Sequence, residues 1–439
     1  MRKLLSAAVV VLWGLPYFAF GSSDSTGKPL NMADAVTIAL KKNNELAALR
    51  EELNGSLQAA ELAGSLPNPV LELEGATGAL TSSPDEKSFS IAVSQEIRLT
   101  PVGGRRRDLA RAEAELAQAR LSEAERQLAE HVSQVWLELG LAGRRLELVR
   151  NQYQIAEVLK GVANVRFQAG ELPELEVQLA ELDRRRSELR QMEARAALEN
   201  SRQRLAALLG MKDVGMLPAV GGLPSLPVAI STDEELLAAA LQYRPDYRAY
   251  RLEEQREAAA LALARSEAVP SLAVALSYKN ERSSQNSYEL AGGALVPGKE
   301  RTNDHILGLK LSIPIPVFSR NQAELARASA RASSAKIRLD GARHSISAEV
   351  RSLVAQYRQA LSALEQHRAV LGPIARENLL IHQEAFKLGE VGIQTVLDEK
   401  RRFAEQQENE LGAEKAAHEA YSRMQSAVGG SVEGQGGKR

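Results

Sequence analysis

The spacing of apolar residues predicts a very long helix in the first half of the chain. Residues 104–168 contain no proline, and apolar positions recur there at alternating intervals of four and three. This spacing is the seam of a coiled coil. The positions are Leu128, Val132, Val135, Leu139, Ala142, Leu146, Val149, Tyr153 and Ala156. At 1.5 Å per residue the helix would be roughly 100 Å long, so its seam must face another helix rather than a compact core.

A tight turn and a returning helix provide that partner. Gly170 can end the long helix, Pro173 suits the first turn of the next one, and residues 174–209 then run back. The second half is predicted to do likewise, with a helix over about 321–387, a turn at 389–392 and a return to about 428. The chain should therefore contain two antiparallel helical hairpins. Their tips carry Gly170, Glu171 and Leu172 in the first hairpin and Gly389, Glu390 and Val391 in the second.

Similar segments recur in the same order in both halves, which indicates an internal duplication. ADAVTIALKKNNELAALR at 33–50 resembles EELLAAALQYRPDYRAYR at 234–251, and LARAEA at 109–114 resembles LARASA at 325–330. These matches, with the two tips, define a first repeat over 31–210 and a second over 232–428. Residues 211–231 are rich in proline and glycine, which suits a linker, and 429–439 are expected to form a disordered tail. An insertion of roughly 15 residues falls between Pro270 and Leu325.

Four stretches that alternate apolar and polar residues are predicted to be β-strands. They lie at about 70–78 and 88–97 in the first repeat and at about 271–280 and 305–315 in the second. One face of this set is apolar throughout. The opposite face carries Glu72, Glu74, Lys279 and Lys310. The polar, glycine-containing connections, above all residues 280–304, are expected to be loops.

The length of these strands fits a lipid bilayer, because a tilted strand needs about nine to eleven residues to cross its core. The polar face would then line a wet lumen. Four strands cannot close a barrel, and open sheet edges are not tolerated in lipid. Several copies must therefore share one barrel, because symmetric closure removes the open edges. A water-exposed β-domain with one face on a core is the alternative that the alternation leaves open.

The first residues have the form of a signal peptide. Arg2 and Lys3 precede an apolar run that ends near Phe20, and Ala19, Phe20 and Gly21 form a small-x-small cleavage pattern. Residues 1–21 are therefore excluded from the fold, and the protein is placed outside the cytoplasm; a membrane anchor is the alternative. The chain has no cysteine, which excludes disulfides and lipidation of an N-terminal cysteine.

Composition and motifs give little sign of catalysis. The formal net charge is −1, so the chain is no polycation that would bind nucleic acid. The six histidines show no HExxH motif, no metal site is predicted, and no cofactor is expected. The glycine pair before Arg105 lacks the frame of a phosphate-binding loop, and the Arg184–Arg186 run is typical of a solvated helix face. No nucleophile, base and orienting group can be assembled, so the chain is interpreted as a non-enzyme.

Over nearly all of its mature length, the sequence resembles the outer-membrane factor (TolC) family of efflux channels. The duplicated hairpins and strands carry the resemblance. LPNPVLELE at 66–74, QEIRL with GGRRR at 95–107, YRPDYRAYRLE at 243–253 and LSIPIPVFSRNQAELARA at 311–328 are also similar to its CzcC-like cation-efflux branch. The TPV at 100–102 departs from that branch, which runs straight into the glycine pair.

This resemblance implies a mainly α protein that forms a homotrimer. Three chains contribute four strands each to a twelve-stranded barrel, which lies in the outer membrane of a Gram-negative bacterium. The barrel continues into a long α-helical periplasmic tunnel. The channel would passively conduct substrates, including heavy-metal cations, that arrive from a periplasmic adaptor (membrane fusion protein) and an inner-membrane pump of the RND type. Outer-membrane lipid would surround the strands.

The resemblance also implies roles for the hairpin ends. The tip residues Gly170, Glu171, Leu172, Gly389, Glu390 and Val391 match positions that meet the adaptor, and Leu172 and Val391 are expected to be exposed there. Glu176 and Asp398 match acidic positions at the periplasmic aperture, whereas Thr395 replaces a further aspartate. Ordinary solvated helix positions are the alternative for both acids.

Two other classes of protein compete with an efflux channel. A periplasmic adaptor also uses a long helical hairpin, but it has one hairpin and a lipoyl-like domain. A secreted coiled-coil structural protein would account for the helices but not for strands of membrane-spanning length.

Overall fold

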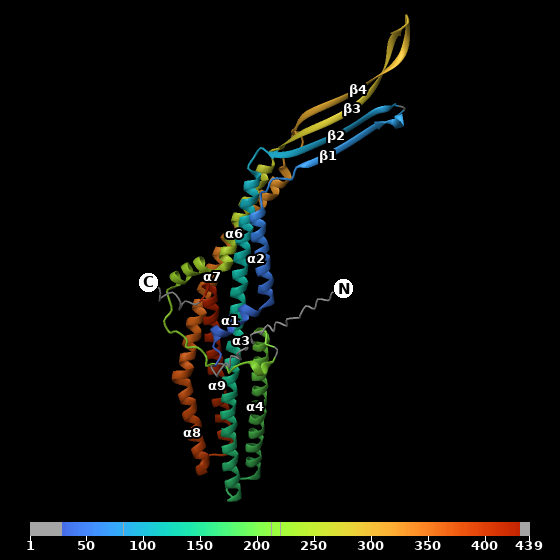
Figure 1. Cartoon of the computed structure of the whole chain (residues 1–439). Coiled ribbons are helices and arrows are strands. Elements are labelled where there is room, and N and C mark those ends of the chain that lie inside the picture. The colour runs from blue at the N-terminus through green and yellow to red at the C-terminus, as the bar shows by residue number, and fades with distance from the viewer. Residues whose placement is uncertain (1–28, 82, 212, 220, 431–439) are drawn as a thin grey trace, which may run out of the picture.

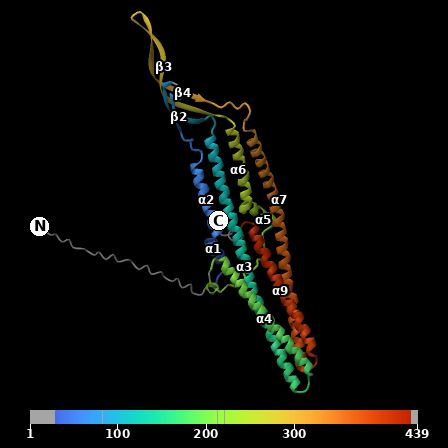
Figure 2. The ribbon, with the colours of Figure 1, turned by 90° about the vertical axis from the view of Figure 1, so that its right-hand side faces the viewer.

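The protein is a long rod of helices with a sheet projecting from one end (Figure 1). The structure, a computed structural model, describes residues 29–430 except 82, 212 and 220. The predicted signal peptide at 1–21 and most of the predicted tail at 429–439 lie outside the described residues. A view turned by 90° shows the same elongated outline, with the strands at one end and the helical tips at the other (Figure 2).

The two halves of the chain contain corresponding elements. The first half has α1 (Met32–Lys42), α2 (Asn44–Leu62), β1 (Val70–Gly78), a 3₁₀ turn (Ala79–Thr81), β2 (Ser83–Arg98), α3 (Val102–Gln168), α4 (Glu174–Leu208) and a second 3₁₀ turn (Val214–Met216). The second half has α5 (Asp233–Tyr243), α6 (Pro245–Glu267), β3 (Ser271–Ala291), β4 (Ala294–Ser312), α7 (Gln322–Gln366), η3 (His367–Leu371), α8 (Gly372–Leu388) and α9 (Ile393–Ala427).

The long helix expected at 321–387 is interrupted. A π-helical turn, η3, separates α7 from α8, and Pro373 lies in the first turn of α8. Proline has no N–H to donate to the preceding turn and its ring clashes there, so a helix that contains it must kink or widen. The corresponding helix α3 contains no proline within 102–168 and runs without interruption.

Short polar caps fix where the paired helices of each repeat begin. Asn31 accepts a hydrogen bond from the Asp34 N–H at the start of α1, and Asn43 accepts one from the Leu46 N–H at the start of α2. In the second repeat Thr232 forms a capping box with Glu235 at the start of α5. Arg244 takes the place of Asn43, with Pro245 following as the first residue of α6.

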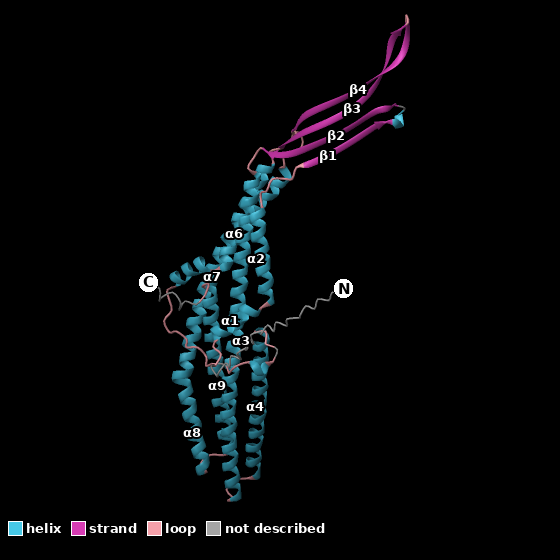
Figure 3. Cartoon of the chain, viewed as in Figure 1, coloured by secondary structure: helices cyan, strands magenta, loops and turns pink. Residues whose placement is uncertain are grey.

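All four strands form one antiparallel sheet in the order β1-β2-β3-β4 (Figure 3). The prediction of a loop at 280–304 is wrong. These residues continue β3 and β4 as a paired hairpin up to Ala291 and Ala294. Gly292 and Gly293 make its two-residue turn, both with positive φ, which suits a tight hairpin. The insertion therefore lengthens a hairpin. Because its side chains are mostly polar, no apolar alternation marked it as a strand.

Buried apolar residues form separate clusters along the rod rather than one compact core. One cluster surrounds Trp136 and joins α1, α3 and α4, and another surrounds Tyr357 and joins α5, α7 and α9. A third lies at the tips, where Phe386 and Ile393 of the second hairpin meet Leu159 of the first. These clusters hold the seams of the long helices together, as expected for coiled-coil packing.

Candidate functional site

The register of the sheet separates an apolar face from a polar one. Leu73, Ile91, Tyr278 and Leu307 form one row of directly paired residues. Paired residues share a face in an antiparallel sheet, and all four belong to the apolar face expected from the alternation. Ile91 and Leu307 are exposed, as are Phe89, Val93, Leu276, Leu309 and Leu311 on the same face. So large an exposed apolar surface marks an interaction site, such as one for lipid.

The neighbouring rows carry the charged residues. Glu74 is level with Ser90 and Lys279, and Lys310 is level with Ala275. Glu72 lies two residues from Glu74, so Glu72, Glu74, Lys279 and Lys310 share the face opposite the leucines. Nζ of Lys279 lies 2.8 Å from Oε2 of Glu281 on this face. Within the described chain, β1 and β4 pair on one side only, which leaves two open edges.

Two glycines bring the strands and helices together at the base of the sheet. A Cβ on Gly64, which has φ of +80°, would lie 2.1 Å from the carbonyl oxygen of Gly103. No other residue fits this close approach of two backbones. The TPV segment forms the start of α3: Pro101 precedes the helix, and Val102 is its buried first residue. The basic turn that follows is tied down, with Nη2 of Arg106 2.7 Å from Oε1 of Glu267.

The two hairpin tips have the same backbone geometry. Gly170 and Gly389 both have positive φ, at 79° and 83°. In each tip the N–H after the glycine donates to a carbonyl five residues back, from Glu171 to Arg166 and from Glu390 to Ala385. A bond of this kind closes the C-terminus of a helix. The positive φ that it requires at the preceding residue is unstrained only for glycine. Glu171 and Glu390 are exposed at these turns.

The structure places the apolar tip residues differently from the expectation. Leu172 is only 7% exposed and packs with Leu159, Phe386 and Ile393, while Val391 is half-buried against the same cluster. Both side chains turn inward because the two tips lie side by side and bury them against one another. Leu172 and Val391 therefore hold the hairpins together and do not form an exposed apolar tip.

The two acids of the expected aperture lie on different helices and have different surroundings. Glu176 on α4 is half-buried, and its Oε2 accepts a hydrogen bond from the Ile393 N–H at 3.0 Å. It therefore caps α9, a helix of the other hairpin. Asp398 on α9 is exposed, with Oδ1 3.6 Å from Nη1 of Arg401. The structure does not bring these two carboxylates together within one chain.

A buried lysine further joins the hairpins. Lys400 on α9 is 5% exposed, and its Nζ lies 2.5 Å from Oδ2 of Asp183 and 3.1 Å from Oγ of Ser187, both on α4. Burial lowers the pKa of Lys400, and the Asp183 carboxylate opposes that shift. This contact could not be predicted from the sequence, because Lys400 lies in the charged segment DEKRR.

The prediction that the Arg184–Arg186 run on α4 is solvated is wrong for its first residue. Arg184 is buried rather than solvated, and it donates hydrogen bonds to Glu181, Glu157 and the Tyr153 hydroxyl. The hydrogen bond from Arg184 holds the pKa of Glu181 well below its usual range. Arg185 and Arg186 are exposed, as expected.

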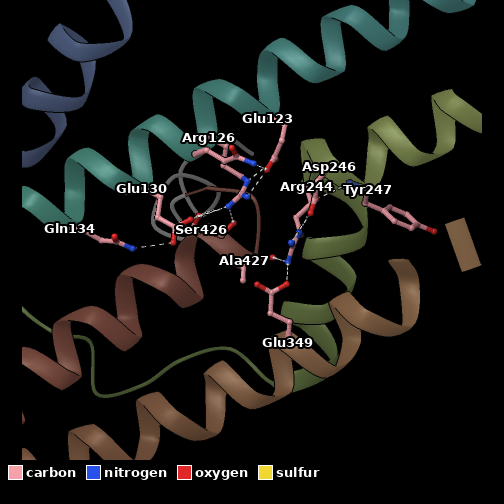
Figure 4. A network of polar contacts seen from close by, with 11 residues as sticks. Glu123, Arg126, Glu130, Gln134, Arg244, Asp246, Tyr247, Glu349, Ser426 and Ala427 are labelled. Carbon is pink, nitrogen blue, oxygen red and sulfur yellow. Dashed lines mark hydrogen bonds and ion pairs between the residues drawn. The ribbon is translucent and has the colours of Figure 1, made fainter. Parts of the chain in front are cut away.

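A network of arginines joins α3, α6, α7 and the end of α9 midway along the rod (Figure 4). Arg244 binds Asp246 through two hydrogen bonds and donates to Glu349 and to the Ala427 carbonyl. Arg126 donates to Glu123 and to the carbonyl and hydroxyl oxygens of Ser426. Burial works against the charge of Arg244, but hydrogen bonds to Asp246 and Glu349 raise its pKa above the ordinary value. Arg126 and Arg244 lie at the C-terminus of α9, where the partial negative charge of the helix dipole favours positive groups.

Beside the linker, a groove of about 1230 Å³ opens between α3, α7 and α9. Its wall includes His418, which is 4% exposed, and Glu414, which pairs with Arg144 and Arg368. Among the described residues there is no cluster of three or more histidine and acidic side chains that could hold a metal ion. None of the helices described is both long and apolar enough to span a bilayer.

Comparison with known protein families shows to which family a chain with this sheet and these hairpins belongs. Residues 35–211 and 236–430 match the model of the family described as outer membrane efflux protein. The chain belongs to this family. The two matched segments each contain one helical hairpin and one pair of strands.

A curated relative and several solved structures resemble nearly all of the chain. The cobalt-zinc-cadmium resistance protein CzcC of Cupriavidus metallidurans is 24% identical, over 98% of this chain and all of the relative. The outer-membrane channel OprN superposes with a TM-score of 0.74 at 17% identity, over 91% of this chain and 90% of OprN. CusC superposes with a TM-score of 0.73 at 17% identity, over 91% and 92% of the two chains.

The outer-membrane protein VceC of Vibrio cholerae shares the fold as well, with a TM-score of 0.71 at 16% identity over 91% of this chain and 96% of VceC. The mainly helical fold with a four-stranded sheet, expected from the sequence, is confirmed. The protein is an efflux channel of the outer membrane. Its relatives are efflux proteins rather than enzymes, and the adaptor and structural-protein alternatives are set aside.

Proposed function

We propose that three copies of this chain form the outer-membrane channel of a tripartite efflux system and conduct heavy-metal cations out of the cell. The observation that carries the trimer is the sheet, with four strands, one exposed apolar face and two open edges. Open edges cannot remain in lipid, and symmetric closure removes them. Three copies contribute twelve strands, which lies within the range of known outer-membrane barrels.

In this arrangement the leucine face contacts lipid and the charged face lines the lumen. Glu72, Glu74, Lys279 and Lys310 then contribute charges of both signs to the wall. The helical hairpins extend away from the sheet and form the periplasmic part of the tunnel, so the tips lie at its entrance. Conduction is passive, because the chain needs only a continuous polar path, and direction is supplied by the pump.

The tips are the proposed meeting place with a periplasmic adaptor, which links the channel to an inner-membrane pump of the RND type. Glu171 and Glu390, exposed beside Gly170 and Gly389, are the side chains available to that partner. Leu172 and Val391 act indirectly by fixing the shape of the two turns. Asp398 is the proposed lining charge of the periplasmic aperture, and Glu176 supports that aperture by capping α9.

The proposed cargo rests on the relative CzcC, whose name states resistance to cobalt, zinc and cadmium. The test is a deletion strain grown on graded concentrations of these three metals and, separately, of organic antibacterial compounds. We expect the deletion to lower tolerance of the metals only, and the wild-type gene to restore it. Loss of tolerance to organic compounds alone would assign a different cargo to the same channel.

The channel itself is tested on purified protein in detergent. Its mass measured by light scattering should correspond to three chains, and planar bilayers containing it should show stepwise conductance. A monomer without conductance would overturn the proposed trimeric channel, whatever the growth assays show.

A further inference from the structure

The continuous apolar face of the sheet ends at an aromatic boundary on the side away from the helices. Tyr278 shares its row with Leu73, Ile91 and Leu307. Its hydroxyl oxygen lies 2.7 Å from Nδ1 of His305, which belongs to the next row of the same face. Amphipathic rings of this kind mark the boundary between hydrocarbon and water in membrane barrels. In the proposed channel this boundary lies in the outer leaflet, because the helices extend from the opposite end of the sheet (Figure 1).

Four exposed cations follow this boundary on the same face, termed the outer face. Lys87 and Arg282 are paired with each other across β2 and β3, four residues beyond the row of Tyr278. Arg301 and Lys299 continue the outer face on β4, because they share the parity of the exposed leucines on that strand. Four residues of a strand tilted by about 45° rise about 10 Å. Lys87 and Arg282 therefore lie above the hydrocarbon, at the level of lipid headgroups.

The outer face carries a surplus of positive charge. Among the described residues of this face beyond the aromatic boundary, the only acid is Asp85 on β2. Its Oδ1 lies 3.2 Å from Nη2 of Arg301, and its Oδ2 lies 3.8 Å from Nζ of Lys299. Lys87 and Arg282 have no ion-pair partner within the part of the chain that the structure describes. One negative charge thus accompanies four positive charges, and two cations remain available to an external anion.

The inner face, opposite to the outer one, has the reverse charge in the long hairpin of β3 and β4. Residues 280–304 contain three cations and four acids. All three cations belong to the outer face, whereas residue parity in the paired strands assigns every acid to the inner face: Glu281, Glu289, Glu300 and Asp304. A hairpin with water on both faces would solvate either sign equally on each of them. The sorted charges therefore indicate that the outer face meets negative groups that the inner face does not meet.

We propose that Lys87, Arg282, Lys299 and Arg301 bind phosphate groups of the lipopolysaccharide that forms the outer leaflet around the channel. This glycolipid carries phosphates directly above its acyl chains, which is where the cations follow the apolar face. Arginine can bind a phosphate through two parallel hydrogen bonds, and lysine provides a compact positive charge. The inference rests on the proposed outer-membrane channel and adds the lipid that its outer rim recognises.

A lipid accounts for the position of these cations better than a soluble polyanion does. Nucleic acid or an acidic polysaccharide in solution would be attracted by the same charges, but it would not require them beside an apolar band. The phosphates of an anchored lipid are held at one level, because its acyl chains contact the leucines of the sheet. Basic residues that directly continue a lipid-facing surface are typical of anionic-lipid recognition.

Binding of purified lipid A, the phosphate-bearing anchor of this glycolipid, tests the site. The detergent-purified wild-type trimer and its variants are titrated with lipid A that carries two phosphates, and affinity is measured by microscale thermophoresis. Lys87→Gln with Arg282→Gln removes the two unpaired cations. We expect the affinity to fall about thirtyfold, since one basic residue near an anionic lipid surface contributes about fivefold. Lys299→Gln with Arg301→Gln, on the other strand of the hairpin, is a second, independent variant and should also weaken binding.

The matched control removes the same number of charges from the opposite face of the same sheet. In Lys279→Gln with Lys310→Gln, both substituted residues belong to the inner face. The affinity of this variant for lipid A should stay close to that of the wild type. An equal loss in the control and in Lys87→Gln with Arg282→Gln would show that only the overall charge matters, and it would overturn the proposed site.

Two further probes identify the ligand. Lipid A with a single phosphate should bind the wild type more weakly than lipid A with two, and this difference should shrink in Lys87→Gln with Arg282→Gln. Equal binding of the two lipids by the wild type would contradict recognition of phosphate. Heparin serves as a water-soluble polyanion. If heparin binds more tightly than lipid A and loses affinity in the same variant, the cations serve a soluble partner and the lipid assignment is wrong.

The outcomes also separate this inference from the proposed function. A trimer that conducts, but whose affinity for lipid A is unchanged in both outer-face variants, would overturn the lipid site and leave the channel standing. A wild-type monomer without conductance would instead overturn the channel on which the inference rests. Light scattering on each variant confirms that three chains are present before its affinity is compared.

Discussion

Arg244 at the start of α6 donates a hydrogen bond to the carbonyl oxygen of Ala427 at the end of α9, with 3.3 Å between Nη1 and the oxygen. These residues are separated by 183 positions in the sequence. Together with the bonds from Arg244 to Asp246 and Glu349, the contact fixes the end of the second hairpin to the helices below the sheet (Figure 4). The hairpin is therefore anchored at one end and joined to its neighbour by the tip cluster at the other.

Replacing Arg244 should loosen this anchor. Arg244→Met leaves Asp246 and Glu349 without their cation and Ala427 without a donor. Because the two carboxylates are 24% and 46% exposed, the loss should cost about 1–3 kcal/mol, as for a hydrogen-bonded group that loses its partner. Hydrogen exchange measured by mass spectrometry should become faster in the last turns of α9. Arg248→Met is the control, because Arg248 lies one turn further along α6 and is exposed. Unchanged exchange at the end of α9 would contradict the anchoring role.

His418 should make the helical part less stable in mild acid. Burial lowers the pKa of His418 below 6.5, and Arg368 and Arg144 add to that shift, while Glu414 opposes it. The unfolded chain then binds the proton more readily than the folded one, so stability is lost as the pH falls below 6.5. We expect the melting temperature to drop less between about pH 7.5 and about pH 5 in His418→Gln than in the wild type.

The control for this measurement is His131→Gln, because His131 is exposed on α3. It should retain the wild-type drop in melting temperature. An equal drop in His418→Gln and the wild type would show that other groups dominate the acid response.

Variants at buried and at exposed residues of the hairpin tips should distinguish a loss of stability from a loss of partner binding. Leu172→Asp buries a carboxylate in the tip cluster and should destabilise the hairpin pair by at least about 2 kcal/mol, as losses at buried apolar sites do. Glu171→Arg with Glu390→Arg reverses two exposed charges and removes the ion pair between Oε2 of Glu171 and Nε of Arg166, which are 3.4 Å apart. Because the Glu171 side chain is exposed, that pair contributes at most about 1 kcal/mol, so the trimer should remain intact. Efflux and co-purification of the adaptor should fall in this double variant.

Glu51→Arg with Glu61→Arg is the matched control, since both glutamates are exposed on α2, away from the tips. Normal efflux by the tip double variant would count against the proposed adaptor contact. A Leu172→Asp protein as stable as the wild type would contradict the burial of that side chain.

Asp398 should influence which ions pass the aperture. Its pair with Arg401 is exposed and separated by 3.6 Å, so it contributes at most about 1 kcal/mol to stability. Three copies of Asp398 around one axis would create a negative potential that favours cations. Asp398→Asn should lower the cation-to-anion permeability ratio in single-channel recordings, whereas Asp398→Glu should preserve it. Equal ratios for Asn and Asp would make the carboxylate an ordinary surface charge.

The periodicity of the sequence was sufficient for the local architecture. A seven-residue apolar repeat without proline specifies a long helix with one apolar face, and a glycine at its end specifies a turn. This predicted α3, α4 and α9 closely, with the returns at Gly170 and Gly389. Alternation in the strands likewise separated Leu73 and Leu307 from Glu74 and Lys279, because the two faces of a strand follow directly from residue parity.

Contacts between distant segments could not be obtained in this way. Leu172 reads as an exposed tip residue until the second hairpin covers it, and Arg184 reads as a solvated cation until Tyr153 and Glu157 enclose it. The strands at 280–304 are held by backbone pairing between polar residues, which leaves no apolar pattern. Periodicity records which side of an element is apolar, whereas burial depends on which other segment arrives there. That choice is made only when the whole chain has folded.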